Sequence, residues 1–295
     1  MTSSRPEVVA VFGPTASGKS AVSELVAAAL GTEVVSADAM QVYRGLPILT
    51  NQPTSPTRLV AIRDLSDEFS VGEYTRLARE EIDDLVRANG AAVVSGGTGL
   101  YLRAALVDLE LPPAVDAETR ARWEARYESD PDVAYERLQE LDPPAAAIVH
   151  RNDRRRVVRA LELAERGSSL VPTHDRLWSG GTRLPTKVMG LDVPLDRLEQ
   201  RIRTRTEDMF ARGVIEEVRE ALAGEISRTA EKALGLRELA DGSPELAREQ
   251  LIARTRRYAA YQRKWMRRIG SLVMINGDRP PEEVAGDILG LVCAR

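Results

Sequence analysis

Short runs of consecutive apolar residues alternate with stretches of helical periodicity in the first third of the chain. Consecutive apolar, β-branched positions are typical of strands buried on both faces of a parallel sheet, whereas apolar residues three or four positions apart indicate amphipathic helices. The alternation predicts an α/β core with a doubly wound, mostly parallel sheet, whose ligands bind at the carboxyl ends of the strands. The predicted strands are 7–12, 32–38, 91–97, 187–193 and 271–276, and the first predicted helices are 18–30, 73–88 and 99–107.

The alternation stops near residue 112, and a strand pattern resumes near residue 187. Between these positions the apolar spacing is helical at 117–128, 133–141 and 153–166, which predicts a helical insertion in the core. Residues 195–268 are again helical almost throughout. The predicted domains are a first part of the core (1–112), a helical insertion domain (113–186) and a second, largely helical part of the core (187–295).

Composition narrows the class of protein. Hydrophobic residues make up 43% and charged residues 29% of the 295 residues, which is typical of a globular chain. No apolar run approaches the roughly 20 residues that span a bilayer. A single cysteine, Cys293, excludes an internal disulfide and a cysteine metal site, and two poorly spaced histidines do not suit zinc. Because the first strand begins so early, we expect no signal peptide and a cytoplasmic location, and we expect a monomer.

The formal net charge of −4 is unevenly distributed along the chain. Acidic residues dominate 64–84, while arginines dominate 151–159 and 254–268. The net charge argues against indiscriminate binding of nucleic acid, but local clusters of arginine can still form basic faces. Both arginine clusters fall within predicted helices.

The sequence GPTASGKS fits the phosphate-binding pattern G-x-x-x-x-G-K-[ST] and lies between the first predicted strand and the first predicted helix. Its glycines allow successive backbone N–H groups to face one anion, and the following helix adds its positive N-terminal end. The Lys19 ammonium suits a terminal phosphate, and the Ser20 hydroxyl suits a bound Mg²⁺ ion. The pattern predicts that a di- or triphosphate binds, with Mg²⁺, at Gly13, Pro14, Thr15, Ala16, Ser17, Gly18, Lys19 and Ser20.

The acidic residue that a P-loop NTPase uses in hydrolysis is missing from its usual place. Such an enzyme normally has an acid at the end of a second apolar strand, where it holds Mg²⁺. Here the strand AAVVSGG ends in Ser95, Gly96 and Gly97, and the nearest strand-terminal acid is Asp38, in VVSADAMQVY. The sequence therefore favours transfer of a group from the bound phosphate compound over hydrolysis of a nucleotide.

Several further motifs follow the phosphate loop in order. They are SADAMQVY (36–43), GGTGLYLRAAL (96–106), DPPAAAIVHRNDRRRVVRALEL (142–163), RIRTRTEDMFARGVIEEV (201–218), ALGLRE (233–238) and TRRYAAYQRKWMRR (255–268). Taken together, they resemble the motifs of the tRNA dimethylallyltransferase (isopentenyl-tRNA transferase) family, over nearly the whole chain. The sequence departs from the family after QVYRG, where LPILTNQP stands in place of isoleucine-glycine-threonine-alanine-lysine-proline.

The resemblance implies a prenyltransferase that acts on tRNA. In this family the phosphate loop holds the diphosphate of dimethylallyl diphosphate, and the five-carbon group passes to N6 of the adenine on the 3′ side of the anticodon. Diphosphate is the leaving group. The implied partners are the tRNA anticodon stem-loop and dimethylallyl diphosphate, and the implied cofactor is Mg²⁺.

The resemblance also implies roles for residues around the donor. Arg205 aligns with the family's diphosphate-binding arginine, and Asp38 is our candidate for the base that orients the adenine amino group and takes its proton. Thr98, in GGTG, is implied to be a second polar contact near the reacting centre. Simpler interpretations remain open, since Arg205 could be a solvated surface residue. Asp38 could cap a helix beginning at Ala39, and Thr98 could cap the helix over 99–107.

An enzyme that modifies a base inside a folded stem-loop must extract that base from its stack, which calls for basic residues and for apolar or π surfaces. Tyr258, Tyr261 and Trp265 fall on one face of a predicted helix, where packing in the core is the simpler interpretation. The arginines around them would then face RNA. The predicted tRNA contacts are Asp38, Ala39, Met40, Gln41, Arg120, Arg155, Arg156, Arg159, Arg256, Arg257 and Arg263.

Three functions remain open from the sequence. The first is the tRNA prenyltransferase. The second is a prenyltransferase that acts on free adenine nucleotides, although the helical insertion and the two arginine-rich helices argue against it. The third is a P-loop small-molecule kinase, or an ATP-dependent module that binds nucleic acid without transferring a group.

Overall fold

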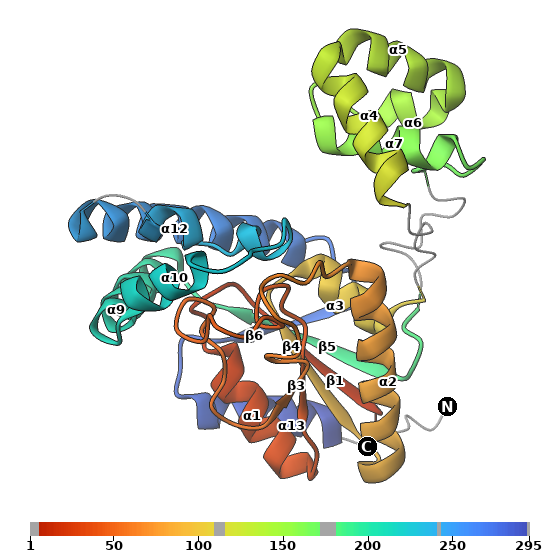
Figure 1. Ribbon diagram of the computed structural model, residues 1–295. Helices are drawn as coiled ribbons and strands as arrows, with labels where there is room; N and C mark the ends of the chain where they lie inside the picture. The colour runs from red at the N-terminus through yellow and green to blue at the C-terminus, as the bar shows by residue number, and fades with distance from the viewer. Residues whose placement is uncertain (1–5, 109–115, 172–180, 241–242, 294–295) are drawn as a thin grey trace. The chain divides into compact units, whose positions relative to one another are not determined.

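The structure is a computed structural model that describes residues 6–108, 116–171, 181–240 and 243–293 (Figure 1). The chain forms two compact units, one made of Met1–Asp108 with Trp178–Arg295 and the other of Leu109–Leu177. Each unit has its own hydrophobic core. Within the described ranges, no helix combines the length and the apolar character needed to cross a membrane.

The larger unit is built on a six-stranded sheet, counted over the described residues, in which every neighbouring pair is parallel. The order is β3-β2-β4-β1-β5-β6, with β1 (Val8–Phe12), β2 (Val34–Ser36), β3 (Thr57–Arg58), β4 (Ala92–Gly96), β5 (Thr186–Asp192) and β6 (Leu272–Asn276). β1 lies between β4 and β5, where Val8 is opposite both Ala92 and Thr186. All residues of β1 and β4 are buried, as their consecutive apolar positions require. The predicted α/β fold with a parallel sheet is confirmed.

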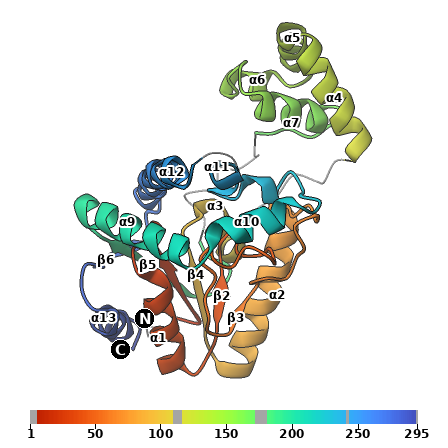
Figure 2. The ribbon, with the colours of Figure 1, turned by 60° about the vertical axis from the view of Figure 1, so that its left-hand side comes forward.

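Helices cover both faces of this sheet (Figures 1 and 2). α1 (Lys19–Leu30) and α13 (Pro281–Cys293) pack together on one face, in a core that includes Val26, Val93 and Ile288. On the other face lie α2 (Val71–Asn89) and α3 (Gly99–Leu106), which meet through Tyr74 and Tyr101. The sequence also sets the start of α2, because the Ser70 side chain caps the helix by accepting a hydrogen bond from the Glu73 N–H.

A second group of helices in the larger unit packs on a core of its own. It comprises α9 (Leu195–Ala211), α10 (Val214–Leu222), the 3₁₀ helix η1 (Ala230–Lys232), α11 (Leu236–Ala240) and α12 (Pro244–Met266). This core includes Val214, Leu236 and Leu251, and it takes in Leu46 and Leu49 from the segment after β2. The packing therefore places the late helices against the loops that follow the strands, where a ligand of a doubly wound sheet binds.

The smaller unit is a bundle of short helices. They are α4 (Ala117–Ser129), α5 (Pro131–Leu141), α6 (Pro143–Ile148) and α7 (Arg154–Ala164). Each begins after an aspartate whose side chain accepts a backbone N–H of the first turn, and these caps are Asp116, Asp130, Asp142 and Asp153. Leu138, Val157 and Leu161 are fully buried in the core of the bundle.

Two short segments make backbone hydrogen bonds in or beside the sheet where the sequence shows no strand pattern. Thr57–Arg58 forms β3 beside β2, although these two residues are too few to give an alternating pattern. Before β5, the Arg183 N–H donates to the Leu106 carbonyl at 2.8 Å, and the Glu7 N–H donates to the Pro185 carbonyl at 2.9 Å. Arg183 and Pro185 are therefore hydrogen-bonded to the end of α3 and to the residue before β1 ahead of the strand.

Candidate active site

The phosphate loop connects β1 to α1 and takes the tight curl that its sequence predicts. Gly18 (φ 87°) and Ala16 (φ 65°) both have left-handed backbone, and the Ser17 N–H donates to the Pro14 carbonyl at 3.2 Å. A side chain at Gly13 would place its Cβ 2.6 Å from the Ser17 hydroxyl oxygen, so the Ser17 side chain would have to move to admit it. The first N–H groups of α1 have no intrahelical acceptors, so this end of the helix is suited to an anion.

Lys19, Arg205 and Asp38 form the charged centre of the site. Burial lowers the pKa of Lys19 to about 8, while the Asp38 carboxylate raises it and the Arg205 guanidinium lowers it. Burial also lowers the pKa of Arg205, again opposed by Asp38. These mutual effects show that three charged groups from α1, α9 and the end of β2 lie together. Two cations and one carboxylate leave a positive excess, which suits a diphosphate.

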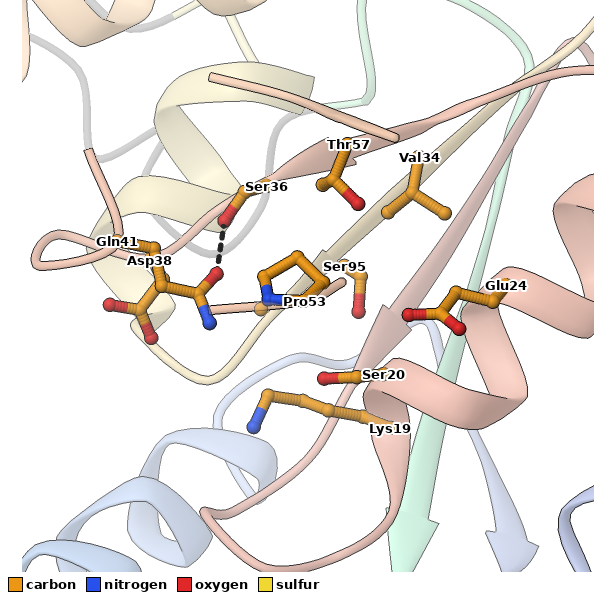
Figure 3. Close-up of a pocket in the computed structure, with 11 residues that line it drawn as sticks. Lys19, Ser20, Glu24, Val34, Ser36, Asp38, Gln41, Pro53, Thr57 and Ser95 are labelled. Atoms are coloured by element: carbon orange, nitrogen blue, oxygen red, sulfur yellow. Dashed lines mark hydrogen bonds between the residues drawn. The ribbon is translucent and has the colours of Figure 1, made fainter. Parts of the chain in front are cut away.

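A pocket opens beside these charges (Figure 3). Lys19 and Ser20 enter it from the start of α1, and Asp38 and Gln41 enter it from the segment after β2. Two further hydroxyls, those of Ser36 and Ser95, come from the carboxyl ends of β2 and β4. The remaining lining residues are Glu24, Val34, Pro53, Thr57 and Gly96. The pocket lies where the carboxyl ends of parallel strands meet the phosphate loop, as predicted for this fold.

The pocket's oxygen groups fit a hard cation such as Mg²⁺. They include the Ser20 hydroxyl and the carboxylates of Glu24 and Asp38. In the described part of the chain, no three His, Cys, Asp or Glu side chains gather as a metal site. A magnesium ion would therefore depend on the phosphate oxygens of a ligand together with Ser20, which is how Mg²⁺ is usually held beside substrate phosphates.

Asp38 lies in a turn rather than at the start of a helix. Its Oδ1 atom accepts the Met40 N–H at 2.9 Å, and residues 39–42 form bends and turns, so the alternative interpretation of Asp38 as the cap of a helix beginning at Ala39 does not hold. Within the described residues, Oδ2 of Asp38 has no hydrogen-bond partner. One oxygen thus fixes the orientation of the carboxylate, and the other is available to a bound group.

The Gln41 side chain holds the segment after β2 together. Its Oε1 accepts the Ser36 hydroxyl at 2.8 Å (Figure 3), and its Nε2 donates to the Asn51 carbonyl at 2.9 Å. Ala39 and Met40 are half-buried on the turn between Asp38 and Gln41. The structure brings this predicted tRNA-binding segment, Asp38 to Gln41, next to the phosphate loop.

Thr98 lies directly before α3, but its hydroxyl makes no capping hydrogen bond. The hydroxyl is instead 3.2 Å from the hydroxyl of Tyr258 on α12. The pKa of Tyr258 is raised to about 12, chiefly by burial and also by the Asp38 carboxylate, while the hydrogen bond with Thr98 lowers it. The Tyr258 hydroxyl is therefore a protonated group that lies within the electrostatic field of Asp38, a role that its place in an aromatic stripe did not indicate.

The close approach of α12 explains the glycines of the GGTG motif. A Cβ at Gly99 would overlap the Trp265 ring. The third aromatic residue of the predicted stripe, Tyr261, is 54% exposed, so the interpretation of the stripe as one core-packing face is wrong. Tyr258 and Trp265 pack towards the glycine motif, while Tyr261 faces solvent and meets Trp265 edge-on, with the ring centroids 6.4 Å apart.

The predicted RNA-binding arginines of α12 differ in their surroundings. Arg256 pairs with Glu199 at 3.0 Å, and Arg263 pairs with Asp192 at the end of β5 at 3.3 Å. Arg257 is exposed and donates to the Ala253 carbonyl, and it has no ion pair among the described residues. Arg257 is thus the residue of this group whose charge is most available to an incoming phosphate.

The other predicted RNA-binding arginines belong to the smaller unit. Arg120 and Arg159 both pair with Glu162, at 2.8 and 2.9 Å, although Glu162 is only 1% exposed. Arg156 lies 3.6 Å from Asp153, and Arg155 is exposed with no ion pair among the described residues. The buried Glu162, whose position the sequence did not indicate, holds two guanidinium groups on one side of the bundle.

Comparisons with known proteins match nearly the whole chain. The IPP transferase family matches residues 41–269, and the isopentenyl transferase family matches residues 6–63. A tRNA dimethylallyltransferase of Streptomyces griseus is 38% identical over 288 residues, which cover 93% of this chain and 91% of the relative. The corresponding protein of Salinispora tropica is 40% identical over 277 residues, with 88% and 85% covered.

A solved structure supports the same relation. The crystal structure of the full-length tRNA isopentenylpyrophosphate transferase from Bacillus halodurans matches with a TM-score of 0.69 and 31% identity, and 97% of each chain is covered. The identity to named relatives and the structural match both extend over nearly the whole sequence. This chain therefore belongs to the tRNA dimethylallyltransferase family.

Proposed function

We propose that the protein transfers a dimethylallyl group from dimethylallyl diphosphate to N6 of the adenine that follows the anticodon of a tRNA on its 3′ side. Diphosphate is released. The curated relatives are named for tRNA dimethylallyl transfer, and the pocket beside the phosphate loop offers the groups that such a reaction needs. The arginines of α12 and of the smaller unit are the proposed contacts for the anticodon stem-loop.

In the proposed reaction the bond between C1 of the donor and the diphosphate oxygen breaks, and a bond forms between C1 and N6. The bonding electrons leave with diphosphate, and N6 loses one proton to the Asp38 carboxylate. Lys19, Arg205 and the loop N–H groups stabilise the negative charge that develops on the leaving diphosphate. Bound Mg²⁺ would supply Lewis-acid stabilisation of the same charge.

The observation that carries this proposal is the place of Asp38. Its carboxylate lies close enough to affect the pKa of Lys19, of Arg205 and of Tyr258. A carboxylate beside the cations of an anion site opposes anion binding, so its presence calls for another role. A base for the amino group of the acceptor is such a role, because it must lie within hydrogen-bond reach of the reacting nitrogen.

Mass analysis of nucleosides tests the proposal. The protein would be incubated with isotope-labelled dimethylallyl diphosphate, Mg²⁺ and unmodified tRNA, and we expect labelled N6-isopentenyladenosine after digestion. Asp38→Asn should lower turnover by a factor on the order of 10² or more, as the loss of a general base does, with little change in tRNA affinity. Asp84→Asn, at an exposed position of α2, is the matched control and should behave as wild type.

A parallel incubation would also contain AMP and ATP. Label in these free adenine nucleotides instead of tRNA would overturn the proposed acceptor, and consumption of ATP with no labelled nucleoside would indicate a kinase. Turnover of Asp38→Asn close to that of wild type would remove Asp38 from the role of base while leaving the transfer itself intact.

A further inference from the structure

Gln262 of α12 lies between the phosphate loop and the glycine motif after β4. Its side-chain amide is 2% exposed. The Oε1 atom accepts the Thr15 N–H of the phosphate loop at 2.8 Å, and the Nε2 atom donates to the Gly97 carbonyl at 2.9 Å. One side chain thus joins two loops to a helix that lies far from both in the sequence.

The space around this amide is closely matched to it. A Cβ at Gly97 would overlap the Gln262 amide nitrogen and would lie 2.9 Å from the Gly13 carbonyl oxygen. The same turn is held a second time by α12, since Thr98 meets Tyr258 at 3.2 Å. Residues 258 and 262 are one helical turn apart, so they present neighbouring side chains on one face of α12.

The hydrogen bond also determines which loop groups can bind the donor. The Thr15 N–H is directed to Gln262, and the Ser17 N–H is used in the turn to Pro14. The N–H groups left for a diphosphate are therefore that of Ala16 and those of the left-handed Gly18 and the first turn of α1. The bond to Gln262 fixes the orientation of the Pro14–Thr15 peptide, and this orientation determines the direction of the N–H groups that follow in the loop.

We propose that Gln262 is a positioning residue of the donor site, which holds the phosphate loop and the Gly97–Thr98 turn at a fixed separation. Through this separation it sets where the diphosphate lies relative to the reacting adenine. The inference rests on the proposed function and adds to it a residue that acts through the phosphate loop. Displacements of about 1 Å in such a site can cost a factor on the order of 10² in rate.

The chemistry of the amide provides the test. A glutamine side chain can accept and donate at once, a glutamate keeps the acceptor but loses the donor, and a methionine of similar length has neither. Gln262→Met and Gln262→Glu therefore break one or both links with little change in volume. Gln250→Met, at an exposed position of the same helix, is the matched control.

Two affinities would be measured for each variant, that for inorganic diphosphate with Mg²⁺ by calorimetry and that for tRNA by filter binding. We expect Gln262→Met and Gln262→Glu to weaken diphosphate binding about tenfold or more, as expected for a misplaced anion site. tRNA affinity should stay within about twofold, because the arginines of α12 are unchanged. Gln250→Met should alter neither value. The kcat/KM for the donor should fall in parallel with diphosphate affinity.

The two readouts separate positioning from simple structural support. If diphosphate and tRNA binding weaken equally in both variants, Gln262 merely keeps α12 folded in place and the inference is overturned. Undiminished diphosphate binding in both variants overturns it as well. Wild-type protein that binds neither diphosphate nor dimethylallyl diphosphate would instead overturn the proposed function, and with it any role of Gln262 in holding the donor.

Discussion

Lys19 has a pKa close to neutrality before any ligand is bound. Burial lowers it to about 8, and Asp38 opposes that effect only in part. A bound diphosphate favours the charged ammonium, so the complex retains the proton to higher pH than the free protein does. Above the pKa of the free protein, binding must therefore take up a proton, and affinity falls as the pH rises.

We expect the affinity advantage of wild type over Lys19→Met for inorganic diphosphate to be constant below about pH 7.5 and to shrink above about pH 8.5, by at most about tenfold per pH unit. Because both proteins bind the same ligand, the effect of diphosphate protonation on affinity cancels in the ratio of the two affinities. Calorimetric titrations across this range measure it. An advantage that stays constant up to about pH 10 would mean that Lys19 keeps an ordinary pKa in the free protein.

Some residues of the site can be identified from a short sequence motif, and others only from their contacts in the folded protein. Lys19, Ser20 and Asp38 lie in short motifs whose spacing indicates both the chemistry and the place, and the structure gathers them around one pocket. Gln262 and Tyr258 carry no such signal, because helical spacing shows that they share a face but not which loop that face meets. The glycines at 97 and 99 were the available hint, since glycine in a motif often marks close backbone approach.

At the scale of elements, α10 holds the segment after β2 where the sequence departs from the family pattern. The Glu217 carboxylate accepts the N–H groups of Ile48 and Leu49, both at 2.7 Å. Burial raises the pKa of Glu217, and the two N–H donors lower it. Nearby, Gln52 donates to the Tyr43 carbonyl at 2.7 Å. The altered segment is therefore anchored from the helix side as well as from within.

Glu217→Ala should lower the free energy of unfolding by about 1–3 kcal/mol, because two partly buried N–H groups lose their acceptor. Urea denaturation monitored by circular dichroism measures the change. Glu220→Ala, at an exposed position one turn further along α10, should stay within about 0.5 kcal/mol of wild type. Equal effects of the two substitutions would show that the Glu217 carboxylate does not stabilise the segment.

The secondary structure followed from the sequence where periodicity was long and uniform. α1, α2, α3 and the buried strands lie where consecutive apolar runs and helical spacing place them. β3 was not predicted because two residues carry no period, and its pairing with β2 is a tertiary contact. The sequence left a helix at Ala39 open for a related reason: an aspartate that accepts a nearby N–H looks the same in sequence before a turn as before a helix.

At the scale of the whole molecule, a chain of net charge −4 must attract an RNA backbone through local charge. Many arginines of the two basic segments are already paired with acids, as Arg256 is with Glu199 and Arg120 is with Glu162. A phosphate must compete with those carboxylates, so these arginines contribute less than a count of charges suggests. Arg155 and Arg257, which have no ion pair among the described residues, are the stronger candidates.

We therefore expect Arg155→Gln and Arg257→Gln each to reduce the slope of log K against log salt for tRNA binding by about 1, as the loss of one phosphate contact does. Filter binding at several salt concentrations measures the slope. Arg76→Gln, an exposed arginine paired with Glu80 on α2, controls for the change in net charge and should leave the slope unaltered. The number of counterions released depends on how many RNA phosphates the protein neutralises, and not on the overall charge of the protein. A slope that is unchanged in both Arg155→Gln and Arg257→Gln would therefore place the RNA contact on another surface.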